Sequence, residues 1–323
     1  MKKLTALSSA VMVAAALSIT SAAAQDAWPS KPITLIVPFA PGGNTDLIAR
    51  TIAPKLGEKL GQSVIVENRP GAGGTIATTE TAAAPADGYT MQIGDISTHA
   101  ISPYVYKTLT YNALEDFEPV IQVTSVPLLL VVNPQVEANS VQELIALAKM
   151  DPDSLSYASS GNGSPQHLAF EYFKSIAGIE PVHIPYNGSA PALTDVIAGH
   201  VPMMIDGTAV PHVKTGALRA LAVTGTERTQ ALPDVPTLAE AGVKDFAFTS
   251  WHGIMYPAGV PEEIINKVNA AVDEILKEEE VRSRFADINI GLAGGSPEQF
   301  ALFIRAENEK MKSLVERSGA TKD

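Results

Sequence analysis

ITLIVPFAPGGNTD occupies residues 33–46 and contains three structural signals in succession. Its first half, Ile33–Phe39, is almost entirely apolar, which is typical of a parallel strand buried on both faces. Two glycines then break the strand, and apolar residues recur every four positions over Ile48–Leu60. That spacing predicts a helix with Asn44 or Thr45 as its N-cap. We therefore expect a strand, a tight turn and a helix, which is the repeating unit of an α/β fold.

The same unit recurs along the chain. Two more short strands are predicted at Val64–Val66 and Thr90–Ile93, and a second series begins at Ser140, which has Glu143 at capping-box spacing. The second series contains predicted strands at 155–158, 182–184, 203–205 and 220–223, and predicted helices at 165–178 and 190–198. Strands that alternate with helices predict parallel sheets with helices on their faces. Two further helices are predicted, over 261–277 and from about residue 297.

The length of the chain predicts two lobes. Its 323 residues exceed the roughly 250–300 residues at which a single hydrophobic core stops growing. Two long apolar runs, Val120–Val132 and Phe246–Tyr256, join one series to the other. Two crossings between the series indicate a hinge. We expect a discontinuous lobe one of residues 25–124 and 249–323, and a lobe two of residues 125–248.

The N-terminus has the features of a secretory signal peptide. Two lysines precede an apolar run that ends at Ile19, and the small residues Ser21–Ala24 follow. The run is shorter than the roughly 20 apolar residues of a transmembrane helix. We expect cleavage after Ala24 and a soluble, exported mature protein. The chain has no cysteine and therefore no lipoprotein anchor, so the predicted compartment is the periplasm.

The charge of the chain argues against nucleic acid as a partner. Lys and Arg number 23 against 35 Asp and Glu, a net charge of −12. Loss of the two signal-peptide lysines leaves 21 basic against 35 acidic residues, a charge of −14. Binding to phosphate backbones requires basic stripes, and the sequence shows only scattered basic residues.

Two glycine-rich loops are the best candidates for a binding site. Pro41–Asp46 and Ser159–Ser164 each follow a predicted strand and open a predicted helix. That geometry directs backbone N–H groups and the positive end of a helix at one point, which favours an anion. Neither loop contains Lys or Arg, so N–H groups and hydroxyls would hold the ligand. Such loops can also be mere connections, but one in each lobe predicts a cleft between the lobes.

The sequence contains only weak motifs for nucleotide binding, metal binding or catalysis. There is no Walker A sequence, and Gly71–Gly74 lacks the spacing of a dinucleotide fingerprint. The six histidines have no metal-ligand spacing, and no G-x-S-x-G elbow is present. We expect no catalytic residue, metal or cofactor. The enzyme alternative is a periplasmic hydrolase that uses Ser160 or Ser164 with His167.

Ordered motifs along the mature chain carry a family resemblance. They are WPSKPI (28–33), VPFAPGG (37–43), VENRPGAGG (66–74), DGYT (87–90), YASSG (157–161), IPYNGS (184–189), LPDVPT (232–237) and SW (250–251). The sequence resembles the Bug (TctC-type) family, the periplasmic solute-binding receptors of tripartite tricarboxylate transporters. The resemblance implies a two-lobed α/β periplasmic-binding-protein fold of the Venus-flytrap kind (type II-like), which closes on a small carboxylate. It also implies membrane subunits similar to TctA and TctB as partners.

In such receptors the two βα loops grip one carboxylate, largely through backbone groups and ordered waters. Carried over to this sequence, the resemblance implies a ligand site made of Phe39, Ala40, Gly42, Gly43, Asp46, Ser160, Gly163, Ser164 and His167, with Ser97, Thr98, Tyr186 and Asn187 shaping the remainder. Asp206 is a further candidate that the family pattern does not supply. Asp46 has an alternative role as a helix N-terminal charge, and Tyr186 has one in core packing.

Asp206 departs from the apolar or small residue that the family pattern leads us to expect at this strand end. If it faces the cleft, it favours an ammonium or hydroxyl on the ligand, and hence a monocarboxylate or amino acid rather than citrate. Its alternative role is that of a solvated or capping turn residue, and Asp95 raises the same question. We expect a monomeric receptor that delivers a mono- or dicarboxylate or an amino acid to a transporter, with a sensor of the same fold as the alternative.

Overall fold

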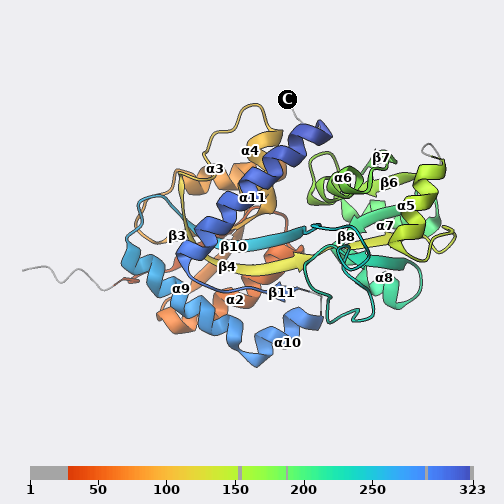
Figure 1. Cartoon of the computed structure of the whole chain (residues 1–323). Coiled ribbons are helices and arrows are strands. Elements are labelled where there is room, and N and C mark those ends of the chain that lie inside the picture. Colours follow the sequence, from red (N-terminus) through yellow and green to blue (C-terminus); the bar gives the residue numbers. More distant parts are fainter. Residues whose placement is uncertain (1–27, 152–154, 187, 288–289, 321–323) are drawn as a thin grey trace, which may run out of the picture.

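The computed structural model describes residues 28–151, 155–186, 188–287 and 290–320. The predicted signal peptide, residues 1–24, lies outside the described residues. Two β-sheets with flanking helices stand side by side and are joined by long strands (Figure 1). We call the six-stranded sheet with its helices lobe one, and the five-stranded sheet with its helices lobe two. Among the described residues, no helix is both long enough and apolar enough to cross a membrane.

Lobe one is built on a sheet with the strand order β11-β4-β10-β3-β1-β2. Its strands are β1 (Ile33–Val37), β2 (Val64–Asn68), β3 (Thr90–Asp95), β4 (Phe117–Pro127), β10 (Thr249–Pro257) and β11 (Gly291–Leu292). Strand β1 is parallel to both its neighbours, β2 and β3, as the βα units predict. Strand β10 is antiparallel to β3 and β4, because it returns from lobe two.

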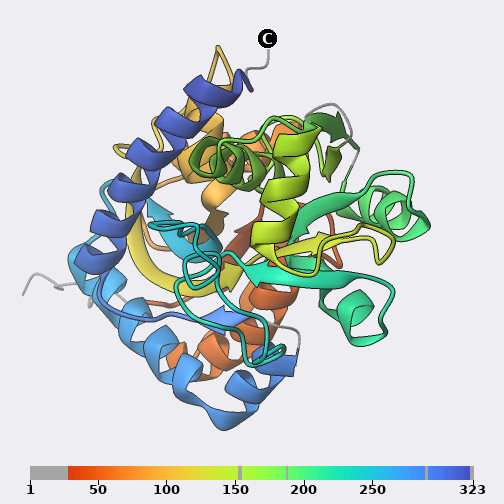
Figure 2. The ribbon, with the colours of Figure 1, turned by 45° about the vertical axis from the view of Figure 1, so that its right-hand side comes forward.

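Helices cover both faces of this sheet. They are α2 (Asn44–Leu60), α3 (Thr75–Ala82), α4 (Ser102–Val105), α9 (Glu262–Lys277), α10 (Glu279–Asp287) and α11 (Pro297–Ser318), with the short turns η1 (Ala72–Gly74) and η2 (Ser97–Ile101). On one face, Leu35 of β1 shares a core with α2 and α9. On the other, the Trp251 ring of β10 packs edge-on against Phe300 of α11. Figure 2 shows α11 and the α9–α10 pair along different sides of the lobe.

Lobe two has the strand order β7-β6-β8-β5-β9. Its strands are β5 (Leu129–Val132), β6 (Ser156–Ser159), β7 (Val182–Pro185), β8 (Met203–Asp206) and β9 (Arg219–Val223). Its helices are α5 (Val141–Met150), α6 (Pro165–Ala177), α7 (Ser189–Ala198) and α8 (Val210–Lys214), with the turn η3 (Gly207–Ala209). Alternate residues of β5 enter different cores: Leu130 packs with α5 and α6, and Leu129 packs with α7 and α8. The strand is therefore buried on both faces.

Two strands carry the chain between the lobes. Strand β4 passes into β5 with only Leu128 between them, and β10 brings the chain back to lobe one. The two crossing strands pair with each other from Phe117 to Pro127, and both views show them side by side (Figures 1 and 2). This arrangement confirms the predicted α/β architecture with two crossing strands.

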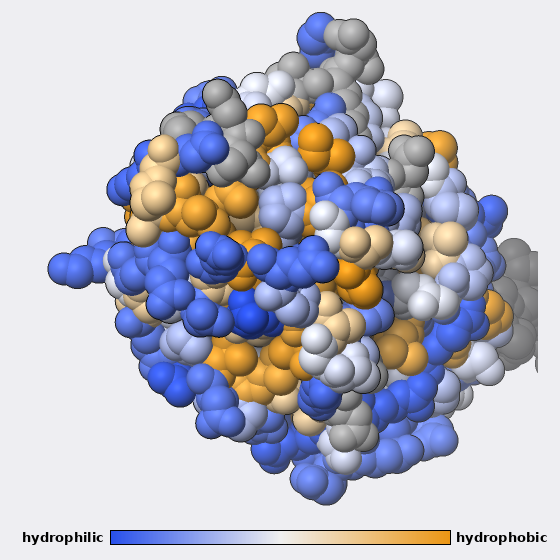
Figure 3. Space-filling model, turned by 90° about the vertical axis from the view of Figure 1, so that its right-hand side faces the viewer, coloured by the Kyte–Doolittle hydropathy of each residue, from blue (hydrophilic) through white to orange (hydrophobic). Residues whose placement is uncertain are grey.

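The end of the molecule formed by lobe two has a mixed surface. Figure 3 shows hydrophobic residues there in separate patches that hydrophilic residues divide. Exposed large apolar side chains of this lobe include Met150, Ile176 and Val182. Single exposed apolar residues are ordinary on soluble proteins, so we turn to the loops between the lobes for the binding site.

Candidate ligand cleft

The loops that follow the parallel strands of both lobes lie beside the crossing strands. Asp95, the last residue of β3, is in register with His252 of β10, and Asp206, the last residue of β8, is in register with Leu129 of β5. Ligands of open α/β sheets bind outside the carboxyl ends of the strands. A Cβ atom placed on Gly163 would lie 3.1 Å from the Val105 side chain. The loop of lobe two therefore approaches α4 of lobe one.

Asp46 organises the loop of lobe one. Its side chain accepts hydrogen bonds from the Gly42 N–H (3.0 Å), the Arg50 Nε (3.0 Å) and the Asn68 Nδ2 (2.9 Å). The residue is only 4% exposed. Burial acts to raise the pKa of this carboxyl, but the hydrogen bonds from Arg50, Gly42 and Asn68 outweigh burial and lower it. Asp46 thus holds the loop together and does not present a free carboxylate to the cleft.

The first turn of α2 carries unpaired backbone N–H donors. Gly43 is the N-cap, and no side chain caps the helix. The N–H groups of Asn44, Thr45 and Asp46 have no acceptor in the described part of the chain. Ala40, Gly42 and Gly43, which were predicted to touch the ligand, are exposed here, whereas Phe39 is half-buried and its carbonyl accepts from Asn68. Unpaired N–H groups at a helix start favour an anion.

The turn after β3 contributes one half-exposed hydroxyl, that of Ser97. Thr98 is buried, and its N–H and hydroxyl both donate to Asp95 Oδ1 at 2.9 Å. Burial raises the pKa of Asp95 to about 6, although hydrogen bonds from Thr98 and Ser97 act in the opposite direction. Asp95 and Thr98 therefore support this turn from inside. Turn η2 is a π-type turn, which occurs often at functional sites.

The loop of lobe two is held by its own helix. Ser164 caps α6 by accepting the His167 N–H at 3.2 Å. The Gly163 N–H donates to His167 Nδ1 at 3.1 Å, and the Ser160 hydroxyl donates to Gln166 Oε1 at 2.7 Å. His167 is only 4% exposed. Neither Ser160 nor Ser164 bonds to the imidazole ring, so the structure does not assemble the serine–histidine pair that a hydrolase would require.

Asp206 has the capping role that we weighed against ligand contact. Its side chain is fully buried and accepts from Gln166 Nε2 (3.0 Å), the Ser189 hydroxyl (2.7 Å), and both the N–H (2.7 Å) and the hydroxyl of Thr208. The N–H bond caps turn η3. All four lone-pair directions of the carboxylate are occupied, so it cannot pair with an ammonium in the cleft without losing one of them.

Tyr186 also has an internal partner. Its hydroxyl donates to Asp195 at 2.7 Å, and its N–H donates to the Ser159 carbonyl. Burial and this hydrogen bond raise the pKa of Tyr186 to about 12. The ring is half-buried at the rim of lobe two. Asn187, the other predicted residue of this turn, lies outside the described residues.

The sequence reasoning missed the side chains that connect the loops to the sheets. Gln166 joins Ser160 to Asp206, and Asn68 joins Asp46 to the Phe39 carbonyl. Neither has a local signal, because its partners come from other elements. Arg50 did have one, since it stands four residues after Asp46 in a predicted helix, which is ion-pair spacing. No group of metal-ligating side chains occurs in the described ranges.

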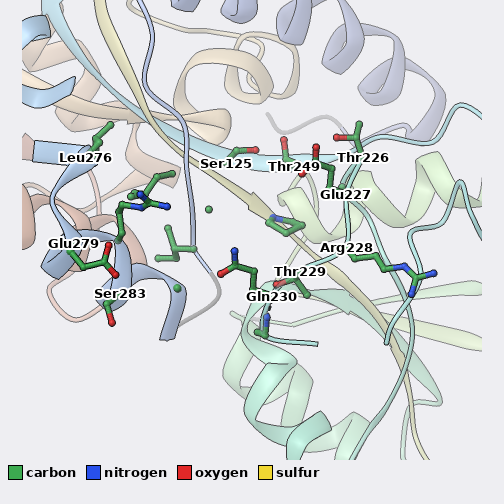
Figure 4. Close-up of a pocket in the computed structure, with 18 residues that line it drawn as sticks. Ser125, Thr226, Glu227, Arg228, Thr229, Gln230, Thr249, Leu276, Glu279 and Ser283 are labelled. Atoms are coloured by element: carbon green, nitrogen blue, oxygen red, sulfur yellow. Dashed lines mark hydrogen bonds between the residues drawn. The ribbon is translucent and has the colours of Figure 1, made fainter. Parts of the chain in front are cut away.

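A separate cavity of about 640 Å³ lies at the other edge of the crossing strands. It is lined by Ser125 and Thr249 of these strands, by the loop 225–231 of lobe two, and by α10 with β11. In Figure 4 the Gln230 side chain points into it, whereas Arg228 points away. Strands β11 and β4 stand at the edge of the sheet away from β1, so this cavity is distinct from the cleft of the glycine loops.

Two α/β lobes that are joined by two crossing strands, each lobe with a neutral glycine loop, form the architecture of a two-lobed solute-binding protein. Residues 48–320 match the family described as "TctC: Tripartite tricarboxylate transporter family receptor". The chain belongs to this family of periplasmic receptors, as the motifs predicted. The matching family and the similar structures are solute-binding proteins, so the chain is a solute-binding receptor and not an enzyme.

Known proteins extend this assignment. The chain is 38% identical over 309 residues to "Protein BugT" of Bordetella pertussis, with 95% of both chains covered. It is 39% identical to a structure entitled "R. palustris Rpa4515 with adipate", with a TM-score of 0.80 and coverage of 91% of this chain and 99% of that one. It is 33% identical to MatC of Rhodopseudomonas palustris "with bound malate", with a TM-score of 0.76 and coverage of 89% and 100%. The carboxylate-binding character of the family is thus found in two of its similar structures.

Proposed function

We propose that this receptor captures a small dicarboxylate between its lobes and delivers it to membrane subunits of a tripartite transporter similar to TctA and TctB. The observation that carries the proposal is the set of unpaired N–H groups in the first turn of α2, Asn44 to Asp46, in the described part of the chain. Similar structures contain adipate and malate, both of which are dicarboxylates.

The electrostatics of the cleft favour a dicarboxylate over an amino acid. The acidic side chains at the loop ends are Asp46, Asp95 and Asp206, and each is buried and accepts hydrogen bonds from its own lobe. A ligand ammonium would therefore find no free carboxylate among them. This placement removes the basis for our expectation, from Asp206, of a monocarboxylate or amino acid.

Neutral donors suffice for useful affinity. A hydrogen bond to a charged group contributes about 1.5–3 kcal/mol, and micromolar binding corresponds to about 8 kcal/mol. Two or three such bonds from each lobe would reach this range after the cost of ordering the ligand. Because the net charge of the chain is strongly negative, local N–H groups and not the overall field must attract the anion.

A proline substitution tests the role of the helix start. Asn44 is the first residue of α2, where proline is tolerated, and Gly43 already has the extended conformation (φ −82°, ψ 172°) that a following proline requires. Asn44→Pro removes one N–H and leaves the helix intact, whereas Asn44→Ala keeps the N–H and serves as the control.

Calorimetry with adipate and malate would measure the effect. We expect Asn44→Pro to weaken binding about tenfold or more, the value of one charged hydrogen bond, and Asn44→Ala to bind like the wild type. Equal affinity of the proline variant and the wild type would contradict the proposed anion site. Tight binding of an amino acid, with neither dicarboxylate bound, would contradict the proposed ligand class.

We also propose export with cleavage after Ala24 and two lobes formed by residues 25–124 with 249–323 and by residues 125–248. The apolar run after the N-terminal lysines and the small residues 21–24 support export. Intact mass of the protein recovered from the periplasm of an expressing cell gives the mature N-terminus. A mass that includes residues 1–24 would refute the cleavage.

A further inference from the structure

Two histidines form a stack directly beneath the loop of lobe two. The rings of His167 in α6 and His183 in β7 lie with their centroids 4.0 Å apart and their planes 8° from parallel. The Tyr157 ring continues the stack below His183 (4.8 Å), and Phe170 lies against Tyr157 (3.9 Å). The column joins α6, β6 and β7, and each imidazole stacks against a neighbouring ring.

Each histidine holds one part of the 159–164 loop. His167 Nδ1 accepts the Gly163 N–H at 3.1 Å. His183 Nε2 lies 2.7 Å from the Ser159 hydroxyl, whose oxygen accepts the Gly161 N–H at 3.1 Å. Both glycines have positive φ angles, +129° for Gly161 and +70° for Gly163. The stack thus fixes the two flexible positions on either side of Asn162.

We propose that His167 and His183 are positioning residues that hold the lobe-two loop in its ligand-binding shape only while both rings are uncharged. A backbone N–H can only donate, so Nδ1 of His167 must carry no proton. Protonation at Nδ1 would set two N–H donors against each other and release Gly163. A second charge on His183 would face the first across the 4.0 Å stack. This inference rests on the proposed function, because it assigns the loop to ligand binding.

The charged groups around the pair act in opposite directions, since Glu171 favours an imidazolium and Lys174 opposes it. The groups that face it are Glu171 and Lys174 of α6, Tyr157 of β6 and Glu180 of the α6–β7 turn. Glu171 Oε1 is 4.0 Å from His167 Nε2, but the same oxygen already accepts from Lys174 Nζ (2.9 Å) and the Tyr157 hydroxyl. Lys174 also lies 3.4 Å from Glu180. The carboxylates are therefore largely committed to other donors.

The burial of the two histidine rings also favours their uncharged forms. Burial, with smaller contributions from His183 and Lys174, lowers the pKa of His167 to about 4, although Glu171 acts in the opposite direction. Burial also lowers the pKa of His183. Both rings are consequently neutral at the pH of most periplasms, and acidification is the condition that would release the loop.

The conservative variant His167→Asn tests the proposal, because the asparagine oxygen can occupy the position of Nδ1 and does not titrate. In ligand-free protein, NMR would follow the Gly163 amide and the His167 ring from pH 7.5 to about pH 3, one unit below the pKa of the ring. We expect the amide signal to move with the titration of the ring in the wild type and to stay fixed in His167→Asn. His212→Asn, on α8, is the control and should behave like the wild type. If the chemical shift of the Gly163 amide does not change as the His167 ring titrates, the proposal is wrong.

Binding gives the second measurement. Adipate affinity of the wild type should fall about tenfold for each pH unit below the titration of the ring, beyond the fall seen in His167→Asn, because binding then requires the loss of one proton. The variant corrects for protonation of adipate itself. Parallel pH profiles of the two proteins would overturn the proposal. Failure of adipate to bind at pH 7.5 would instead contradict the proposed function, and the ligand-free NMR result would still decide the role of the stack.

Discussion

Asp206→Asn separates a capping role from a ligand role for the buried carboxylate at the end of β8. In the structure, Oδ1 accepts from the Thr208 N–H and hydroxyl, and Oδ2 accepts from Gln166 Nε2 and the Ser189 hydroxyl. An amide has one acceptor oxygen in place of two. Hydroxyls can rotate to accept from the new NH2 group, but the Thr208 N–H and the Gln166 NH2 group cannot. One N–H donor is therefore left without its acceptor, whichever way the asparagine faces.

The magnitude follows from these contacts. An unpaired buried donor costs about 1–3 kcal/mol, and the remaining hydrogen bonds become neutral ones that contribute about 1 kcal/mol less each. Relief from burying a charge offsets part of this loss. We expect the free energy of unfolding to fall by about 2–4 kcal/mol, which corresponds to a decrease in Tm of roughly 3–6 °C for a chain of this size. Adipate affinity should also fall, because Gln166 would no longer hold the Ser160 hydroxyl.

Thermal unfolding of the ligand-free protein measures the effect without any assumption about the ligand. Asp234→Asn is the matched control, since Asp234 is an exposed carboxylate of the same lobe and its loss should change stability by less than about 0.5 kcal/mol. An Asp206→Asn protein that unfolds at the wild-type temperature but loses ligand affinity would refute our reasoning. It would place the carboxylate in the binding site after all.

Three more outcomes can be measured. Burial lowers the pKa of His99 to about 3 and of His167 and His252 to about 4. Between pH 6 and pH 4 the unfolded chain therefore binds about three protons that the native state does not bind. The raised pKa of Asp95 (about 6) means that the native state binds one that the unfolded chain does not. The free energy of unfolding, measured by urea titration, should therefore fall by roughly 3 kcal/mol for each pH unit of acidification in this range. A free energy of unfolding that does not change with pH would be inconsistent with neutral buried rings. Solution scattering should show compaction on adding adipate, since two crossing strands permit hinge closure; an unchanged radius of gyration with bound ligand would indicate a rigid cleft. The cavity of Figure 4 should widen when the cleft closes, because it lies at the opposite edge of the crossing strands. Ala286→Trp should therefore tighten adipate binding several-fold by filling the widened form, whereas weaker binding would show that its walls approach on closure.

Local patterns predicted the elements well, because their causes are local. The capping-box spacing of Ser140 and Glu143 corresponds to an observed N-cap hydrogen bond of 3.2 Å. The apolar run Ile33–Val37 forms a strand buried on both faces, and the four-residue period after it forms α2. The two glycine loops also open helices where the sequence places them.

The roles of individual site residues were harder to predict. Thr98, His167 and Asp206 were expected to touch the ligand, and each is buried beneath its loop. Strand β8 is buried on both faces along its whole length, so a period-two pattern gives no information about the direction of Asp206. The partners of Asp206 come from α6, α7 and η3, which are distant in sequence and meet only in the folded lobe.

The sequence by itself determined the α/β class, the two series of βα units, the two crossings and the position of both glycine loops. These features depend on apolar periodicity, caps and chain breakers, which act within a few residues of each other. Tertiary structure alone decided which polar groups remain free for a ligand. Each buried carboxylate takes hydrogen bonds from several elements, and only their packing shows that Asp46, Asp95 and Asp206 are saturated while the first turn of α2 is not. Hydrogen-bond satisfaction is a property of the whole fold, and the proposed binding site rests on what is left unpaired.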